Sequence, residues 1–90
     1  MHLNELRLEI DRIDDEIIRL FCARMEVAAK IGAYKKANGL PVFVPEREQE
    51  KLSDVMKKAG PEMADYTKSL YEHLFLLSRS YQQEGTTEVV

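Results

Sequence analysis

The chain has 90 residues, is 44% hydrophobic and 32% charged, and carries a formal net charge of −3 at pH 7. These values predict one soluble domain, and the acidic balance argues against a general nucleic-acid-binding protein, which would need a basic face. We find no long apolar run and no amino-terminal signal pattern, so we predict a cytoplasmic protein without a membrane partner.

The first predicted helix runs from about Leu3 to Lys36, with Asn38 and Gly39 as its stop signal. Ten of its positions follow the three-four spacing of a helix face that packs on other helices: Leu3, Leu6, Ile10, Ile13, Ile17, Leu20, Arg24, Val27, Ile31 and Tyr34. Arg24 is the one that is not apolar, and its guanidinium cannot lose its charge when it is buried. We therefore hypothesise a buried anion site at Arg24. The alternatives are that Arg24 sets the register of helix packing or extends past the stripe to water.

The length of this helix predicts a dimer. At about 1.5 Å per residue it spans roughly 50 Å, whereas a compact domain of this size is about 30 Å across. The helix would extend beyond its own domain, and its apolar stripe would lie in water unless a second chain covered it. We therefore predict an all-α fold with three helices per chain and an obligate, intertwined helical homodimer.

The rest of the chain supplies two more helices. An unusually apolar loop at 39–44 is expected to pack on the helices. The second helix begins near Pro45, ends at Gly60 and Pro61, and carries on its inner face Leu52, Val55 and Met56. The third helix, about Glu62 to Glu84, repeats the packing spacing through Met63, Tyr66, Leu70, Leu74, Leu77 and Tyr81. Residues 1–84 thus form the predicted helical domain, and 85–90 a flexible tail.

The sequence offers no metal site and no nucleophilic constellation. Cys22 is the single cysteine, so it can form no internal disulfide, and we expect a small buried thiol. His2 and His73 are isolated and complete no catalytic or metal-binding set. We therefore expect no cofactor and no metal.

Helix geometry brings cations together. Arg24 and Lys35 are eleven residues apart, so they point within about 20° of each other and lie roughly 16 Å apart along the axis. Two such long side chains could hold one small molecule. Arg7 lies about 25 Å from Arg24 along the axis and about 100° around it, so it cannot reach that ligand from its own chain. In an antiparallel dimer, Arg7 of the partner subunit would complete the site.

Uncharged and acidic groups could join these cations. Ser78 and Gln82 are neighbours on one face of the third helix, and the second helix begins with a segment that includes Arg47 and Glu48. Simpler explanations exist, since such residues are often solvated charges and acids in a first turn complement the helix dipole. Together, however, they supply what a dianion with a hydroxyl would need: several cations, a carboxylate and an amide donor.

This set resembles the all-helical chorismate mutase family, whose members are intertwined dimers of three-helix chains. The resemblance covers Leu3 to about Gln83 and is carried by LRLEIDRIDDEIIRLFCARMEVAAKIGAYK, by PERE after the apolar loop, and by Ser78 with Gln82. It implies the rearrangement of chorismate to prephenate in phenylalanine and tyrosine biosynthesis. That pericyclic reaction needs no nucleophile, proton transfer, metal or cofactor.

The resemblance also implies roles for individual residues. Arg24 and Arg7 of the partner subunit would hold the two carboxylates of chorismate, with Ser78 supporting one of them. Arg47 would be a further cation in the pocket, and Glu48 would accept a hydrogen bond from the ring hydroxyl. Lys35 and Gln82 would donate to the ether oxygen of the breaking bond.

One position departs from the family pattern, because Val44 stands where the best-known members have an aspartate. If that aspartate acts through its backbone N–H, Val44 can replace it in binding the substrate. If the aspartate side chain matters, the hydroxyl contact depends on Glu48 alone.

Two other functions stay open at this point. One is an isochorismate-pyruvate lyase of the same fold. That branch has a similar PER segment, but an apolar residue follows its arginine, where this chain has Glu48. The other is a non-catalytic helical dimerisation or regulatory module, in which Arg24 only sets the register. It does not explain why the other polar residues match a dianion site.

Overall fold

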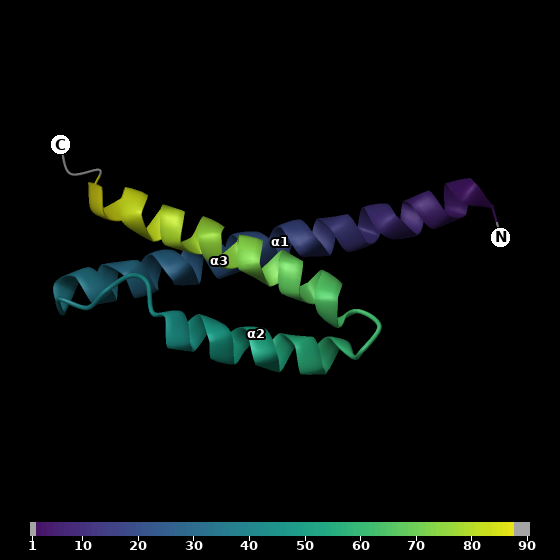
Figure 1. Cartoon of the computed structure of the whole chain (residues 1–90). Coiled ribbons are helices and arrows are strands. Elements are labelled where there is room, and N and C mark those ends of the chain that lie inside the picture. Colours follow the sequence, from purple (N-terminus) through teal and green to yellow (C-terminus); the bar gives the residue numbers. More distant parts are fainter. Residues whose placement is uncertain (1, 88–90) are drawn as a thin grey trace.

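A computed structural model of the chain describes residues 2–87, with side chains as far as Gln82. It contains three helices: α1 (Leu3–Ala37), α2 (Pro45–Ala59) and α3 (Ala64–Thr87). In this part of the chain α3 packs against both other helices, whereas the backbones of α1 and α2 do not approach each other closely (Figure 1). The predicted all-α class and the long first helix are confirmed.

The helices end where the sequence places stop signals. Gly39 has a φ of 65° after α1, and Leu40 N–H donates to the Lys35 carbonyl at 2.8 Å, as in a left-handed glycine cap. Pro45 occupies the first turn of α2, and Gly60 with a φ of 86° follows its end. The glycine cap matters for the site, because it turns the chain directly after Lys35 and sends the loop back across that side chain.

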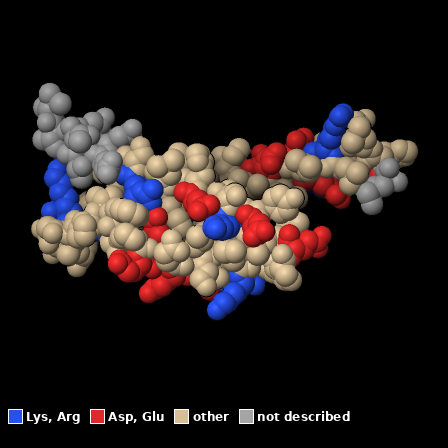
Figure 2. Space-filling view, viewed as in Figure 1, with Lys and Arg blue, Asp and Glu red and all other residues tan. Residues whose placement is uncertain are grey.

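The chain is elongated, as the length of the first helix predicts. Its extents are 54 × 31 × 14 Å, and its radius of gyration is 16.4 Å against about 12 Å for a compact domain of this length. The amino-terminal half of α1 projects beyond the other helices (Figure 1), and every residue from His2 to Leu20 is exposed. Acidic side chains gather on this overhang (Figure 2), which carries Asp11, Asp14, Asp15 and Glu16.

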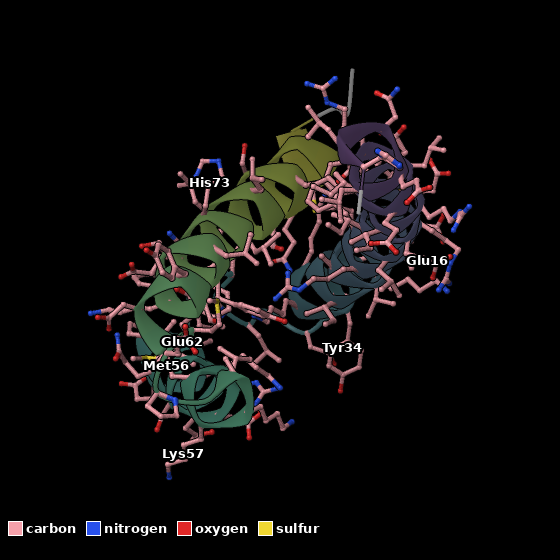
Figure 3. All side chains as sticks on the ribbon, turned by 90° about the vertical axis from the view of Figure 1, so that its right-hand side faces the viewer. Glu16, Tyr34, Met56, Lys57, Glu62 and His73 are labelled. Carbon is pink, nitrogen blue, oxygen red and sulfur yellow. The ribbon has the colours of Figure 1, made fainter. Side chains whose placement is uncertain are left out.

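The core of the single chain is small. Its buried apolar residues are Ala28, Leu52, Val55 and Phe75, and none of the larger described side chains is less than 2% exposed. The inner face predicted for α2 is therefore confirmed at Leu52 and Val55. Along the edges, the labelled Tyr34, Lys57 and His73 point away from the other helices (Figure 3).

The apolar stripe of α1 lies open in the single chain. Its nine apolar members are 38–64% exposed, and on α3 the residues Tyr66, Leu70 and Tyr81 are 43–74% exposed. Cys22, which we expected to be buried, is exposed in the single chain because it lies on the uncovered side of α1. In a single copy of this chain, the apolar residues that the sequence predicts to pack on other helices are thus exposed to solvent.

Both boundaries of α3 differ from the prediction. α3 begins at Ala64, two residues late, because residues 61–63 form a turn after Gly60. It continues to Thr87, so 85–87 of the predicted tail are helical, and 88–90 lie outside the described residues. Within residues 2–87, no helix is long and apolar enough to span a bilayer.

Candidate active site

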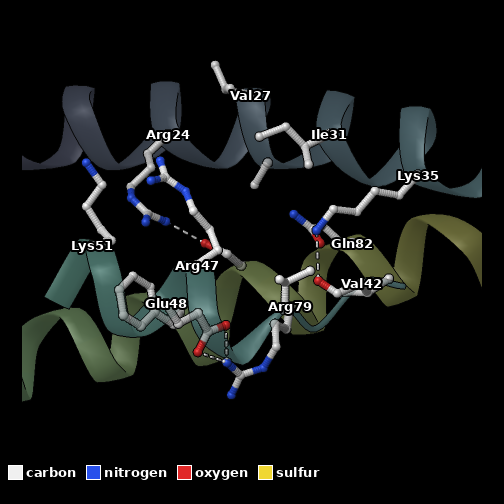
Figure 4. Close-up of a pocket in the computed structure, with 14 residues that line it drawn as sticks. Arg24, Val27, Ile31, Lys35, Val42, Arg47, Glu48, Lys51, Arg79 and Gln82 are labelled. Atoms are coloured by element: carbon white, nitrogen blue, oxygen red, sulfur yellow. Dashed lines mark hydrogen bonds and ion pairs between the residues drawn. The ribbon is translucent and has the colours of Figure 1, made fainter. Parts of the chain in front are cut away.

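A cavity of about 440 Å³ lies between α1 and α2, where α3 and the loop at 38–44 complete its wall (Figure 4). Small-molecule sites are commonly of this size. Seven of the eight residues predicted to contact a ligand line it: Arg24, Lys35, Val44, Arg47, Glu48, Ser78 and Gln82. The structure therefore brings together residues from three helices that the sequence placed up to 58 positions apart.

The lining of this cavity is strongly positive, although the chain as a whole is acidic. Five cationic side chains face it, against the single carboxylate of Glu48. The cations are Arg24, Lys35, Arg47, Lys51 and Arg79. Because like charges raise the free energy of a partly enclosed site, this arrangement favours an anionic occupant that carries more than one charge.

Arg24 lines the cavity and is partly buried. Its Nη1 donates to the Ser78 hydroxyl at 2.6 Å, and its guanidinium carbon lies 6.0 and 5.9 Å from the ring centroids of Tyr71 and Phe75. Ser78 is only 9% exposed, so this contact lies at the base of the site. No carboxylate among the described residues forms an ion pair with Arg24. Its charge is therefore held by neutral groups and aromatic faces, which leaves it available to an anion.

Lys35 and Gln82 both line the cavity, at the end away from Arg24 (Figure 4). The Lys35 Nζ donates to the Val42 carbonyl at 2.9 Å, a contact that the turn after α1 makes possible. Gln82 is 8% exposed, and its buried Oε1 has no hydrogen-bond partner among the described residues. A buried polar atom without a partner is costly, and a half-turn of the amide exchanges its oxygen for its nitrogen. Gln82 can thus offer either an acceptor or a donor to a ligand.

Gly32 sets how closely α3 approaches α1 beside Gln82. A Cβ at Gly32 would lie 3.0 Å from both Cβ and Cγ of Gln82 and 3.3 Å from its Cα. Such distances are shorter than ordinary van der Waals contact, so any larger residue pushes this end of α3 outward. A glycine that is otherwise unfavourable inside a helix is therefore explained by the position of the Gln82 amide.

Arg79 and Lys51 also line the cavity, and the sequence analysis did not identify them. Arg79 Nη1 donates to both carboxylate oxygens of Glu48. Helix arithmetic gave no signal for Arg79, because it pairs across two helices with a residue 31 positions away. Lys51 could have been found, since it follows Arg47 by four positions and Glu48 by three on the same helix. The Lys51 ammonium also lies 3.7 Å from a carboxylate oxygen of Asp54. The pKa of Asp54 is lowered, chiefly by the hydrogen bond from Lys58.

Two predicted residues behave differently from the rest. Arg7 lies on the exposed overhang of α1 and does not line the cavity of its own chain, in agreement with the expectation that it cannot act in cis. Val44 lines the cavity as the residue before α2, and its side chain makes no capping hydrogen bond. Glu48 is consequently the one carboxylate acceptor on the described lining.

A profile of the family described as chorismate mutase type II matches residues 6–83. A chorismate mutase of Methanocaldococcus jannaschii is 30% identical over 88 residues, which cover 91% of this chain and 89% of that protein. No solved structure gives a significant match.

Two further relatives are much longer proteins. A bifunctional chorismate mutase/prephenate dehydratase of Aquifex aeolicus is 49% identical over 55 residues, or 61% of this chain. A T-protein of Haemophilus influenzae is 36% identical over 85 residues, or 92% of this chain. The matched segments span only 15% and 22% of those two proteins. From the family profile and the relative from M. jannaschii, it follows that this chain belongs to the chorismate mutase type II family.

Proposed function

We propose that the chain catalyses the rearrangement of chorismate to prephenate, as the resemblance in sequence implies. The observation that carries this proposal is the cavity in which five cations surround one carboxylate and a buried serine and glutamine. Chorismate carries two carboxylates, a ring hydroxyl and an ether oxygen. Each of these groups has a chemically suitable counterpart on the lining.

The cations would first select the shape of the substrate. Arg24, held by Ser78, would bind one carboxylate at the base of the cavity, and Arg47 would add positive charge nearby. The reactive conformer is compact, and the free dianion adopts it poorly because its charges repel each other. The free energy gained by binding both carboxylates would therefore offset the cost of adopting the reactive conformer.

The second contribution would act on the breaking bond. Negative charge builds on the ether oxygen as the C–O bond lengthens and the new C–C bond forms. Lys35 and Gln82 both line one end of the cavity, where both would donate hydrogen bonds to that oxygen (Figure 4). Donors that are already oriented stabilise this charge more in the transition state than in the ground state.

We further propose that the working unit is an intertwined homodimer. The single chain exposes 7395 Å², whereas a compact monomer of this size exposes about 5,400 Å². The excess of about 2,000 Å² per chain is what an obligate dimer of small subunits buries. The open stripes on α1 and α3 supply apolar surface for that contact.

The same assembly would complete the site. Arg7 stands on the overhang, roughly 25 Å along the axis from Arg24. Antiparallel pairing of two α1 helices would bring the overhang of each chain beside the cavity of the other. Arg7 of the partner subunit would then bind the second carboxylate, giving two equivalent sites in each dimer.

The direct test is to follow chorismate loss spectrophotometrically with the purified chain and to identify the product. We expect prephenate to form far faster than in buffer, and a rate equal to the uncatalysed one would refute the proposal. A parallel incubation with isochorismate distinguishes the lyase, which would release pyruvate. A purely structural module would transform neither compound.

Gly32→Ala is expected to lower kcat for chorismate by about tenfold while the fold is retained. The new methyl gains about 1 kcal/mol of helix propensity, and overpacking against Gln82 costs about 1–3 kcal/mol, so the two effects largely offset in stability. The displaced amide, however, loses its alignment with the ether oxygen. Steady-state kinetics and thermal unfolding measure the two effects separately. Ala33→Ser adds one heavy atom on the exposed side of α1 and is the control; an equal loss there would contradict this role of Gly32.

A further inference from the structure

One contact in the cavity that no predicted role uses is the ion pair of Arg79 with Glu48. It joins α3 to α2, and both side chains are only about a quarter exposed, at 26% and 23%. The pair Arg19–Glu16 on the outside of α1, by comparison, leaves both side chains more than 60% exposed. An ion pair with less water around it is screened less and holds its geometry more firmly.

Arg79 is itself fixed from the other side. Its guanidinium carbon lies 4.6 Å from the ring centroid of Phe43, within the range of a cation–π contact. Phe43 belongs to the loop whose Val42 carbonyl accepts the hydrogen bond from Lys35. The guanidinium is thus held between a loop and a carboxylate, which is how a rigid support for another side chain is built.

Glu48 needs such support because cations surround it. Arg47 and Lys51 precede and follow it on α2, and Arg24 and Lys35 line the same cavity from α1. A glutamate that was free to rotate would pair with one of these cations and neutralise a charge that the dianion requires. The two hydrogen bonds from Arg79 on α3 hold the carboxylate apart from Arg24 and Lys35 (Figure 4).

The bound carboxylate still has accepting capacity. A carboxylate has about four lone-pair directions, and Arg79 uses one on each oxygen. Since Val44 brings no side-chain acceptor to the lining, a hydroxyl on the ligand depends on Glu48. This inference rests on the proposed function of the cavity: we propose that Arg79 is a positioning residue that fixes the Glu48 carboxylate to accept the ring hydroxyl of the substrate.

A double-mutant cycle tests this proposal with Arg79→Gln, Glu48→Gln and the double variant. We expect Arg79→Gln to lower kcat/KM for chorismate by about tenfold to a hundredfold. In the Glu48→Gln background the same substitution should change kcat/KM by less than about twofold, because its target is already lost. Arg79→Lys keeps a charged donor and should recover part of the activity. Arg19→Gln, which breaks an exposed pair, is the control and should match the wild type.

The outcomes separate this proposal from the proposed function. If the wild type does not convert chorismate, the proposed function fails, and this inference fails with it. If the wild type is active but Arg79→Gln has no effect, or its effect is as large without Glu48, only the role of Arg79 is refuted. Thermal unfolding of each variant is measured alongside. Should Arg79→Gln not fold, the comparison of Arg79→Lys in the two backgrounds gives the same decision.

Discussion

Replacing Lys35 with alanine should lower kcat for chorismate by at least about a hundredfold, or about 3 kcal/mol of transition-state stabilisation. Lys35 lines the same end of the cavity as Gln82, where the ether oxygen is expected (Figure 4). The charge on that oxygen appears only as the bond breaks, so the loss should fall on kcat more than on substrate binding. Single-turnover and steady-state kinetics measure both quantities.

Lys35 also holds the loop through its hydrogen bond to the Val42 carbonyl. The loss of the ammonium as a donor to the substrate must therefore be distinguished from loosening of that loop. Lys30→Ala removes an exposed lysine from the same helix, away from the cavity, and should leave kcat within about twofold of the wild type. Thermal unfolding shows whether Lys35→Ala still folds. Near-normal turnover by a folded Lys35→Ala would remove Lys35 from the mechanism.

Ile17→Asp should abolish the dimer and with it cooperative folding. Ile17 belongs to the apolar stripe and is 57% exposed in the single chain. Its burial in a dimer would contribute about 1.5–3 kcal/mol in each subunit, and a buried, unpaired carboxylate would add several kcal/mol of penalty. Both free-energy losses occur in each of the two subunits. The total free energy of unfolding of a protein is only about 5–15 kcal/mol. Sedimentation and circular dichroism measure association and folding.

The neighbouring residue provides the control for this prediction. Ile18 is 61% exposed in the single chain but lies about 100° around the helix from Ile17, off the stripe. Ile18→Asp should therefore remain dimeric and folded. Equal behaviour of the two variants would show that the stripe has no special role in association.

The sequence predicted the helices well because their local signals agree with their packing. Gly39, Pro45 and Gly60 mark helix ends by restricting the backbone, and those restrictions do not depend on neighbouring helices. Both ends of α3 were predicted too early, since residues 61–63 form a turn and the helix continues to Thr87 without a strong signal in the sequence.

The helix period predicted only part of the candidate site. It relates Arg24 to Lys35 on α1, and Ser78 to Gln82 on α3, because each pair shares one face of its helix. Arg79 meets Glu48 only where two helices cross, and no period within one helix reveals such a contact. Gly32 was visible as a weak helix former, but its purpose depends on the Gln82 side chain of another helix.

In the proposed enzyme, the cationic cavity of one chain is completed by Arg7 of the partner subunit. Two variants that should each be inactive, Arg7→Ala and Arg24→Ala, can be unfolded and refolded together to test this shared site. Half of the dimers would then be mixed, each with one intact site, so about a quarter of the wild-type activity should return. Either variant refolded alone should stay inactive. A mixture with no more activity than its components would contradict the shared site.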